Sequence, residues 1–407
     1  MYNINTRLLL NILISLIAAV VGLEFCLRGL MSARAAIRKN NKKSVKEKFN
    51  DLERKIPAMQ DFKNFDKSGI YYQDFVGYLQ KPFKSRHFNI NSEGFRCHEF
   101  TRRKMDGRFR IIIFGSSGLL GVPNCSDDQT IAAYLQKLCD DQGLPAEILN
   151  LGVRSYLIMN ELNLMYRINL DTQYDGIIVF DGYNDVYAAK RGNVYGGYPR
   201  ITNYLSSAWT ARIDKDRRWF KHQMEMINKE IKDGRESFFC KAAPALCRSI
   251  KACRIFSKQY FSGNKNTEKI MQAAYAPSRK FYIQHAGYMM LLARSENKKI
   301  VFCHQPSIYT SQKPFHPAEQ TYYDYSWPIR FQKDPIALEI FKEHYFKQVR
   351  ELEALCRKND VPNIDINGAV NDKDESAHIF HDYCHLTPGG NSLVADELFK
   401  VIREWIK

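Results

Sequence analysis

The chain has 407 residues, of which 45% are hydrophobic and 13% aromatic, and this composition excludes wholesale disorder. Its formal net charge is +16, but residues 1–56 alone carry eleven lysines and arginines against four acidic residues. The rest of the chain is therefore only mildly basic. No zinc-finger spacing, basic-aromatic repeat or RNA-binding signature accompanies this charge, so we expect no nucleic-acid partner and favour an anionic polymer or a lipid surface.

The N-terminus is predicted to hold a membrane-spanning helix. Residues 8–23, LLLNILISLIAAVVGL, carry no charge, and the apolar character continues less cleanly to Met31. Sixteen residues rise about 24 Å as a helix, slightly short of a ~30 Å hydrocarbon core, and snorkelling of the two following charges lengthens the span. A cleaved signal peptide is the main alternative, because the ARA triplet at 33–35 has the form of a cleavage site; a buried helix of a soluble protein is another. We expect an uncleaved signal anchor at residues 1–31.

The residues themselves do not decide on which side of the membrane the chain after the predicted anchor lies. Lysines and arginines after the apolar segment outnumber those before it, which by charge alone places the following segment in the cytoplasm. Ten cysteines are compatible with an oxidising compartment, although there is no CxxC and no tight framework. Cys240, Cys247 and Cys253 are close enough in sequence to pair locally, and the alternative is that the cysteines are mostly buried thiols.

The chain after the anchor is interpreted as a basic linker and entry segment over 32–87, followed by a folded domain over 88–407. The first part of the linker, 32–56, is predicted to be helical, and FNINSEGFRCHEF at 88–100 is predicted to be a short extended segment. Short apolar runs alternate with helical patterns from Arg110 onward. The predicted strands are Arg110–Phe114, Glu147–Leu151, Gly176–Phe180, Lys299–His304 and Asn363–Ile366. The predicted helices are Asp128–Gln142, Leu157–Asn169, Ser278–Glu296, Ile336–Lys358 and Gly389–Ile406.

Fully apolar strands separated by helices predict an α/β fold, a doubly wound parallel five-stranded sheet covered on both faces. Such folds bind ligands beyond the carboxyl ends of their strands. The alternation is interrupted by an insertion of about ninety residues at 188–277, rich in tyrosine, tryptophan and phenylalanine. We expect it to fold as a helical cap over the site. The alternative is an insertion that only packs against the domain and has no role in substrate binding.

The first candidate functional element is Gly115-Ser116-Ser117-Gly118, directly after the first predicted strand. A serine hydroxyl is a weak nucleophile and needs a base within hydrogen-bond reach. The same strand–turn–helix could instead bind phosphate through backbone N–H groups at the start of a helix. Because the full G-x-x-x-x-G-K-[ST] pattern is missing, we do not expect a nucleotide P-loop.

Two further elements follow the second and third predicted strands. NLGVRSY at 150–156 contains Gly152, where the absence of a side chain lets backbone approach a ligand, or which is simply a turn glycine. VFDGYNDVY at 179–187 contains Asn184, whose amide N–H groups suit a developing oxyanion. An Asn-Asp pair after a strand is otherwise a common turn or cap.

The fourth element is HDYCHLTPGGN at 381–391, in which Asp382 and His385 are three residues apart before a predicted helix. This spacing allows Asp382 to hold the imidazole in one tautomer while its other nitrogen faces a serine. A metal site that includes His378 and His381 is the alternative, but no ligand cluster lies near the other three elements, and we expect no metal.

Taken in this order, the four elements resemble the conserved blocks of the SGNH hydrolases, the GDSL-like esterase superfamily, which have a flavodoxin-like α/β fold. The resemblance covers about 110–407, interrupted by the insertion. It places the nucleophile at Ser117 rather than Ser116, the acid and base at Asp382 and His385, and the oxyanion-hole donors at Ser117, Gly152 and Asn184. NSEGFR at 91–96 and HQPSIY at 304–309 are similar to segments of membrane-anchored, extracytoplasmic members.

The resemblance implies a serine esterase that removes an acyl group, for example acetyl, from a glycan or lipid ester without a cofactor. An O-acyltransferase that uses the same triad on an exported polysaccharide is the first alternative. The others are a catalytically silent glycan-binding protein and a structural role in a membrane assembly. Because anchored relatives act on surface or exported glycans and lipids, we expect a single-pass membrane protein with an extracytoplasmic domain. The sequence says nothing of protein partners.

Overall fold

The structure is a computed structural model, and it describes residues 45–73, 76–189, 265–331 and 334–406. The predicted anchor at 1–31, most of the predicted insertion and the cysteines at 240, 247 and 253 lie outside the described residues. Within the described ranges, no helix is both long and apolar enough to cross a membrane.

A five-stranded parallel sheet forms the centre of the fold. Its strands are β3 (Phe109–Gly115), β4 (Ala146–Gly152), β5 (Gly176–Asp181), β6 (Lys299–His304) and β7 (Asn363–Ile364). They lie in the order β4-β3-β5-β6-β7, and every neighbouring pair is parallel. This is the flavodoxin-like strand order, which confirms the predicted doubly wound sheet.

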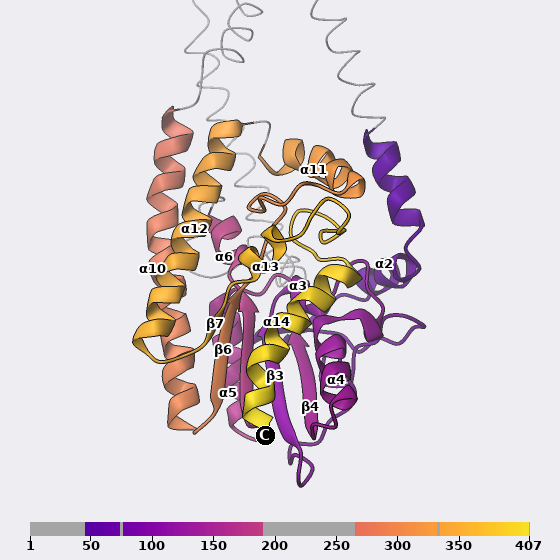
Figure 1. Ribbon diagram of the computed structural model, residues 1–407, viewed down its shortest axis with the longest axis vertical. Helices are drawn as coiled ribbons and strands as arrows, with labels where there is room; N and C mark the ends of the chain where they lie inside the picture. Colours follow the sequence, from indigo (N-terminus) through magenta and orange to yellow (C-terminus); the bar gives the residue numbers. More distant parts are fainter. Residues whose placement is uncertain (1–44, 74–75, 190–264, 332–333, 407) are drawn as a thin grey trace, which may run out of the picture. The chain divides into compact units, whose positions relative to one another are not determined.

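Helices cover both faces of this sheet (Figure 1). The main ones are α4 (Ile131–Asp141), α5 (Ile158–Asn169), α10 (Lys265–Ser295), α12 (Pro335–Lys358) and α14 (Pro388–Ile406). Helices α4 and α14 pack on each other over one face, α5 and α10 cover the other, and α12 lies along α10. In β3, Ile111 and Ile113 pack into the hydrophobic cluster on the α4 and α14 face, and Ile112 and Phe114 pack into the cluster on the α5 and α10 face. Burial on both faces explains why these strands are apolar throughout.

Two predicted boundaries differ from the structure for local reasons. The helix expected to begin at Ser278, directly after Pro277, begins at Lys265 and runs through that proline. Proline lacks an N–H and usually disrupts a helix, so a proline inside α10 is uncommon. The last strand, expected to reach Ile366, ends at Ile364, because the Asp365 side chain accepts the Gly368 N–H and caps the next helix instead.

Several short elements at the carboxyl end of the sheet were not predicted. They are α3 (Ser117–Leu120), α6 (Tyr183–Ala189), α11 (Pro317–Arg330) and α13 (Ile366–Asn371). Helix α11 does carry a start signal, since Pro317 is its first residue and Glu319 accepts the backbone N–H of His316. The others are too short to show a helical period.

Regular secondary structure lies within residues 32–87, the stretch expected to be a basic linker and entry segment. Helix α2 (Ala58–Ser68) and the antiparallel hairpin of β1 (Ile70–Gln73) and β2 (Gly77–Gln80) precede residue 88. Phe65 and Leu79 in these elements are fully buried. These elements before residue 88 therefore contribute apolar side chains to the buried clusters.

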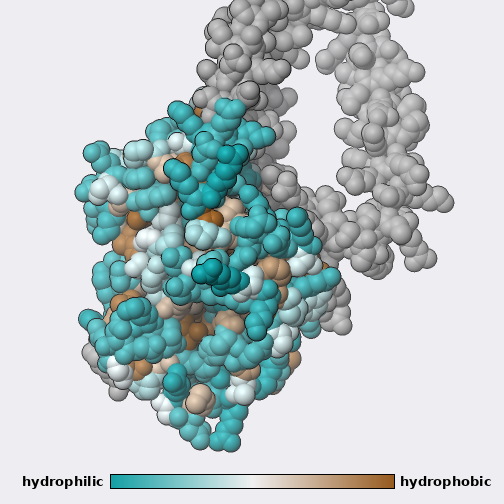
Figure 2. Space-filling view, turned by 90° about the vertical axis from the view of Figure 1, so that its right-hand side faces the viewer, coloured by the Kyte–Doolittle hydropathy of each residue, from teal (hydrophilic) through white to brown (hydrophobic). Residues whose placement is uncertain are grey.

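The face shown in Figure 2 is largely hydrophilic, with apolar side chains scattered singly or in small groups. Among the described residues, the most exposed large apolar side chain is Leu170 at the end of α5. Scattered apolar exposure of this kind is ordinary for a protein surface.

Candidate active site

The turn after β3 presents Ser117 at the first position of α3. The turn is built from small residues because neighbouring backbone lies close to it. A Cβ on Gly115 would lie 2.5 Å from the carbonyl oxygen of Phe180, in the adjacent strand. Gly121 ends the short helix with a φ of 75°, a left-handed conformation that suits glycine. Within this tightly packed turn, Ser117 itself is only partly buried.

Arg96 supports this turn from the entry segment. Its guanidinium is buried and donates to the carbonyl oxygens of Leu120 at 2.8 Å, Gly121 at 3.0 Å and Cys125 at 2.8 Å. Its Nε pairs with Asp127 at 2.8 Å, which compensates the buried charge. The NSEGFR segment, similar to a lead-in of anchored SGNH members, therefore has a physical role here, since it satisfies the open carbonyl groups at the end of α3.

Ser117, His385 and Asp382 form a continuous chain of hydrogen bonds. The Ser117 Oγ lies 2.9 Å from His385 Nε2, and His385 Nδ1 lies 2.7 Å from Asp382 Oδ2. The other oxygen of Asp382 accepts the backbone N–H groups of Cys384 and His385, both at 2.9 Å. Asp382 thus fixes the imidazole with Nδ1 protonated, which leaves Nε2 to accept the serine proton. The structure brings together the three residues singled out from the sequence.

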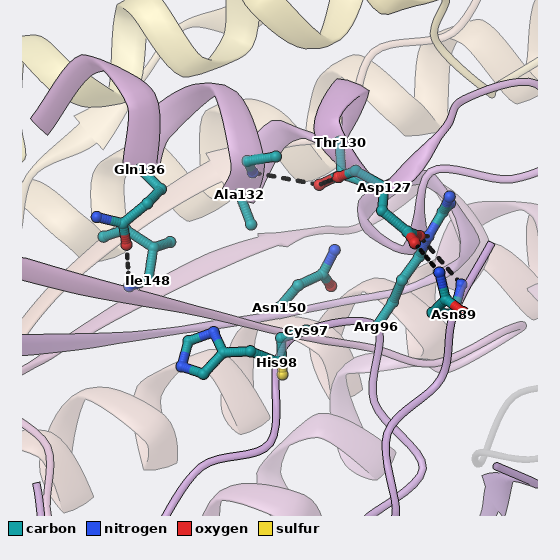
Figure 3. A pocket seen from close by; sticks show the side chains of 11 residues that line it. Asn89, Arg96, Cys97, His98, Asp127, Thr130, Ala132, Gln136, Ile148 and Asn150 are labelled. Atoms are coloured by element: carbon teal, nitrogen blue, oxygen red, sulfur yellow. Dashed lines mark hydrogen bonds and ion pairs between the residues drawn. The ribbon is translucent and has the colours of Figure 1, made fainter. Parts of the chain in front are cut away.

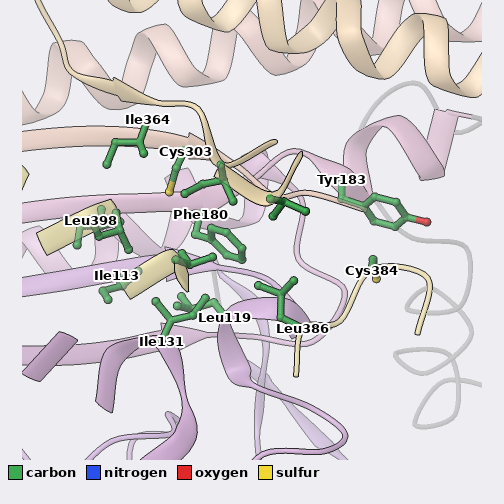
Figure 4. Packing of buried hydrophobic residues seen from close by; sticks show 14 of the residues in the cluster. Ile113, Leu119, Ile131, Phe180, Tyr183, Cys303, Ile364, Cys384, Leu386 and Leu398 are labelled. Atoms are coloured by element: carbon green, nitrogen blue, oxygen red, sulfur yellow. The ribbon is translucent and has the colours of Figure 1, made fainter. Parts of the chain in front are cut away.

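The loop that carries Asp382 and His385 is anchored in the hydrophobic core. Phe380 and Leu386 form an antiparallel bridge at its base. Cys384 and Leu386 are buried in the same core cluster as Leu119 of α3 (Figure 4). Because the loop packs against the helix that starts with Ser117, the two halves of the triad share one set of apolar contacts.

The charges of the triad reinforce each other. Burial by itself raises the pKa of Asp382, but the adjacent His385 imidazole outweighs it and holds that pKa below its usual range. Burial by itself lowers the pKa of His385, and the Asp382 carboxylate reverses this and raises the pKa well above its ordinary value. The pair therefore favours the imidazolium, the form that His385 takes after it accepts a proton from Ser117.

Asn184 lies in α6, directly beyond the end of β5, and is buried. Its Nδ2 donates to the carbonyl oxygen of Tyr156 at 3.0 Å, which ties α6 to the loop after β4. A primary amide has two N–H groups, and in the part of the chain that the structure describes only this one contact is made by Nδ2.

Gly152 is placed differently from the expected donor. Its N–H donates to the side chain of Asn150 at 2.9 Å, and the Asn150 amide in turn donates to the carbonyl of Leu119 at 2.9 Å. A Cβ on Gly152 would lie 2.6 Å from the backbone nitrogen of Leu120. The glycine thus makes room for α3, and its N–H is already bound. Asn150, which was not predicted as a site residue, organises this contact.

Ser155, three residues before α5 begins at Ile158, has a φ of 59°. A left-handed backbone is uncommon for a residue other than glycine, and such strain gathers at functional sites. The loop is held by Tyr78, whose hydroxyl donates to the carbonyl of Arg154 at 2.6 Å, and by Asn184 at Tyr156. Only a backbone angle reveals this feature, so the sequence carried no signal for it.

A metal ion would compete with the triad for the same atoms. Among the described residues, one group has metal-ligating atoms close enough together, namely Asp382, Cys384 and His385. Asp382 and His385 already use these atoms on each other and on Ser117. Burial raises the pKa of the Cys384 thiol, which disfavours the thiolate that binds metals. The donor set therefore suits proton transfer better than metal binding, and His378 instead bonds the carbonyl of Phe380 at 3.1 Å.

A cavity of about 330 Å³ lies away from the triad, between the entry segment and α4 (Figure 3). Its polar side chains bond to the protein itself. Asp127 binds both Arg96 and Asn89, and Gln136 accepts the N–H of Ile148 at 2.9 Å. None of the triad residues lines it. We assign it a structural role, as the space between α4 and the buried arginine.

Comparisons with known proteins concern the fold. No family model and no curated protein matches the sequence. Similar solved structures include the lipase/acylhydrolase from Enterococcus faecalis, with a TM-score of 0.40 and 11% identity over 74% of this chain and 97% of that chain. The acetyl xylan esterase AlAXEase gives 0.37 and 13% over 72% and 100%. A lipolytic protein of the G-D-S-L family from Veillonella parvula gives 0.37 and 12% over 72% and 98%. At these identities, the function has to come from the geometry of the site itself.

Proposed function

We propose that this chain is a serine esterase of the SGNH type, with Ser117 as nucleophile, His385 as general base and Asp382 as its orienting carboxylate. The observation that carries the proposal is the unbroken hydrogen-bond chain from the serine hydroxyl to the carboxylate, at 2.9 Å and 2.7 Å. A nucleophile with a base in reach, and a third group that orients the base, is the arrangement that acyl transfer requires.

In the proposed reaction, His385 Nε2 accepts the proton of Ser117 as Oγ bonds to the ester carbonyl carbon. The tetrahedral intermediate collapses, the bond to the alcohol breaks, and His385 returns the proton to the leaving alcohol. Water then attacks the acyl-serine through the same base, which releases the carboxylic acid and restores the hydroxyl. Asp382 stays ionised and stabilises the imidazolium in both halves, consistent with its lowered pKa.

For the oxyanion we propose the backbone N–H of Ser117 and the side chain of Asn184. The N–H groups in the first turn of a helix have no partner within that helix, so the start of α3 leaves the Ser117 N–H open. Asn184 keeps one amide N–H beyond its bond to Tyr156. Gly152 is left out of the donor set because Asn150 binds its N–H.

The substrate class we propose is an acylated carbohydrate or lipid, at a membrane surface to which residues 1–31 anchor the chain, with the catalytic domain extracytoplasmic. The uncharged run over 8–23 and the net charge of +16 support an association with anionic surfaces or polymers. Labelling of an engineered surface cysteine in intact cells tests the orientation, since a membrane-impermeant reagent reaches only an extracytoplasmic domain.

The test of the activity is hydrolysis of aryl esters of increasing acyl length, and of acetylated oligosaccharides, by the full-length protein in detergent. Ser117→Ala is expected to lose about 10⁴-fold or more in kcat. Asn184→Ala is expected to lose roughly 10²–10³-fold, the cost of one oxyanion donor. Folded wild-type protein without turnover, or equal rates in Ser117→Ala, would contradict the proposal. Release of the acyl group onto a sugar instead of water would identify the acyltransferase alternative.

A further inference from the structure

Gln305 is the first residue after β6 and is fully buried. Its backbone is fixed at both ends. The N–H donates to the carbonyl of Asp181 at 2.8 Å, and its carbonyl accepts the hydroxyl of Tyr345 at 2.8 Å. It belongs to the HQPSIY segment, to which the proposed reaction gives no part. Its side chain therefore projects from a rigid point at the carboxyl end of the sheet.

The side-chain amide of Gln305 bridges the two halves of the triad. Oε1 accepts the hydroxyl of Ser116 at 3.2 Å, and Nε2 donates to the carbonyl of Cys384 at 2.7 Å. Ser116 directly precedes Ser117, and Cys384 directly precedes His385. One planar amide thus joins the turn that carries Ser117, the nucleophile turn, to the loop that carries Asp382 and His385, the acid–base loop. In both segments it binds the residue that directly precedes the reacting residue.

The second glycine of the nucleophile turn is explained by the same side chain. A Cβ on Gly118 would lie 2.6 Å from Nε2 of Gln305 and 2.9 Å from its Cδ. Any larger residue at 118 would push the amide away from Ser116 and Cys384. The GSSG pattern therefore accommodates Gln305 as well as the sharp turn, which couples two segments about 190 residues apart.

We propose that Gln305 is a positioning residue that sets the distance between Ser117 Oγ and His385 Nε2. Asp382 and His385 lie in one loop and hold each other, so their contact does not need Gln305. Ser117 and His385 lie in different segments, and a buried side-chain bond joins their chain neighbours. A misplacement of about 1 Å in a catalytic geometry costs up to about 10²-fold in rate. The kinetic part of this inference depends on the proposed esterase function, and the geometric part does not.

The test compares Gln305→Met, of similar volume but without either hydrogen bond, with wild type. Gln136→Met is the control, because the Gln136 amide also donates one hydrogen bond and accepts one, with the backbone of Ala146 and Ile148, away from the triad. We expect Gln305→Met to lower kcat about 10- to 100-fold with KM within about threefold, while Gln136→Met changes kcat by less than about twofold.

Two measurements separate positioning from general damage. Titration of His385 by NMR should give the wild-type pKa in Gln305→Met, because Asp382 stays beside the imidazole. A crystal structure of that variant should show the Ser117–His385 distance lengthened beyond 2.9 Å. Should Gln305→Met fail to fold, Ser116→Ala removes one of the two bridging bonds alone, and the same split between kcat and KM is expected at smaller size.

A kcat within about twofold of wild type, together with an unchanged Ser117–His385 distance, would overturn the inference. A KM change without a kcat change would also overturn it, because it would assign Gln305 to substrate binding. Absence of turnover in folded wild type would instead contradict the proposed function. The Ser117–His385 distance in a crystal structure of Gln305→Met would still decide whether Gln305 sets that distance.

Discussion

The two halves of the candidate site are held in place by different physical means. The nucleophile turn depends on close backbone packing, in which Gly115, Gly118 and Gly152 leave no room for a Cβ. The acid–base loop depends on buried polar side chains that reach it from the segment after β6. The first half thus depends on small residues that leave space for close packing, and the second on polar partners far away in the chain.

The segment after β6 binds the loop at several points. Ser307 donates its hydroxyl to the carbonyl of Tyr383 at 2.8 Å. Glu319 accepts the backbone N–H groups of Ile379 at 2.8 Å and Phe380 at 2.9 Å, three and two residues before Asp382. The other oxygen of Glu319 pairs with Lys313 at 2.8 Å, and both side chains are fully buried. A buried carboxylate that accepts several hydrogen bonds and faces a cation avoids most of the penalty of burial.

Because of this difference, the two halves of the site are expected to be destabilised by different kinds of substitution. A close-packed turn responds to added volume, whereas a buried ion pair responds to the loss of one partner. Substitutions that change one property at a time can therefore distinguish the two halves.

The largest effect on stability is expected from Lys313→Met. Removal of the lysine leaves the Glu319 carboxylate buried without its cation, and such a loss costs about 3–5 kcal/mol of unfolding free energy. Chemical denaturation of wild type and variant measures it. Lys400→Met, which breaks an exposed pair with Glu397, is the control and should cost at most about 1 kcal/mol. Equal small losses in both would show that the acid–base loop does not depend on the buried pair.

A smaller effect is expected from Gly152→Ala. The new Cβ would lie 2.6 Å from the Leu120 nitrogen, so α3 must shift, at about 1–3 kcal/mol for overpacking. Gly287→Ala in α10 has only one neighbouring atom, at 3.9 Å, and should gain about 0.5–1 kcal/mol from helix propensity. Thermal unfolding of both variants decides the matter, and a Gly152→Ala protein as stable as wild type would mean that the nucleophile turn is not tightly packed.

The smallest expected effect is a displaced pH profile. His385 must be neutral to accept the serine proton, and Asp382 raises its pKa above the ordinary 6.5. Esterase activity should therefore increase with pH and level off only above the range in which an ordinary histidine titrates. Rates of aryl ester hydrolysis across pH 5–9 measure this, and a profile already level below pH 6.5 would contradict the coupling of the pair.

Much of the sheet and the triad could be predicted because local pattern fixes them. Apolar runs such as 110–114 define buried strands. The D-x-x-H spacing made Asp382 and His385 candidates, but only the resemblance to the SGNH hydrolases chose Ser117 over Ser116, and the structure brings the three side chains together. The supporting residues could not be predicted, because Gln305, Lys313 and Glu319 act only through contacts that the fold creates. Gly152 shows the same limit, since a glycine after a strand fits an oxyanion donor and a packing gap equally well, and only the bond to Asn150 separates them.

The central claim, an activated serine at position 117, is tested most directly by intact-mass analysis after treatment with a fluorophosphonate probe. The adduct is mapped by peptide in wild type and in Ser117→Ala, with circular dichroism to show that both are folded. The account predicts one adduct per chain on Ser117 and none in the variant. An adduct on another residue that persists in Ser117→Ala, or no adduct on folded wild type, would contradict it.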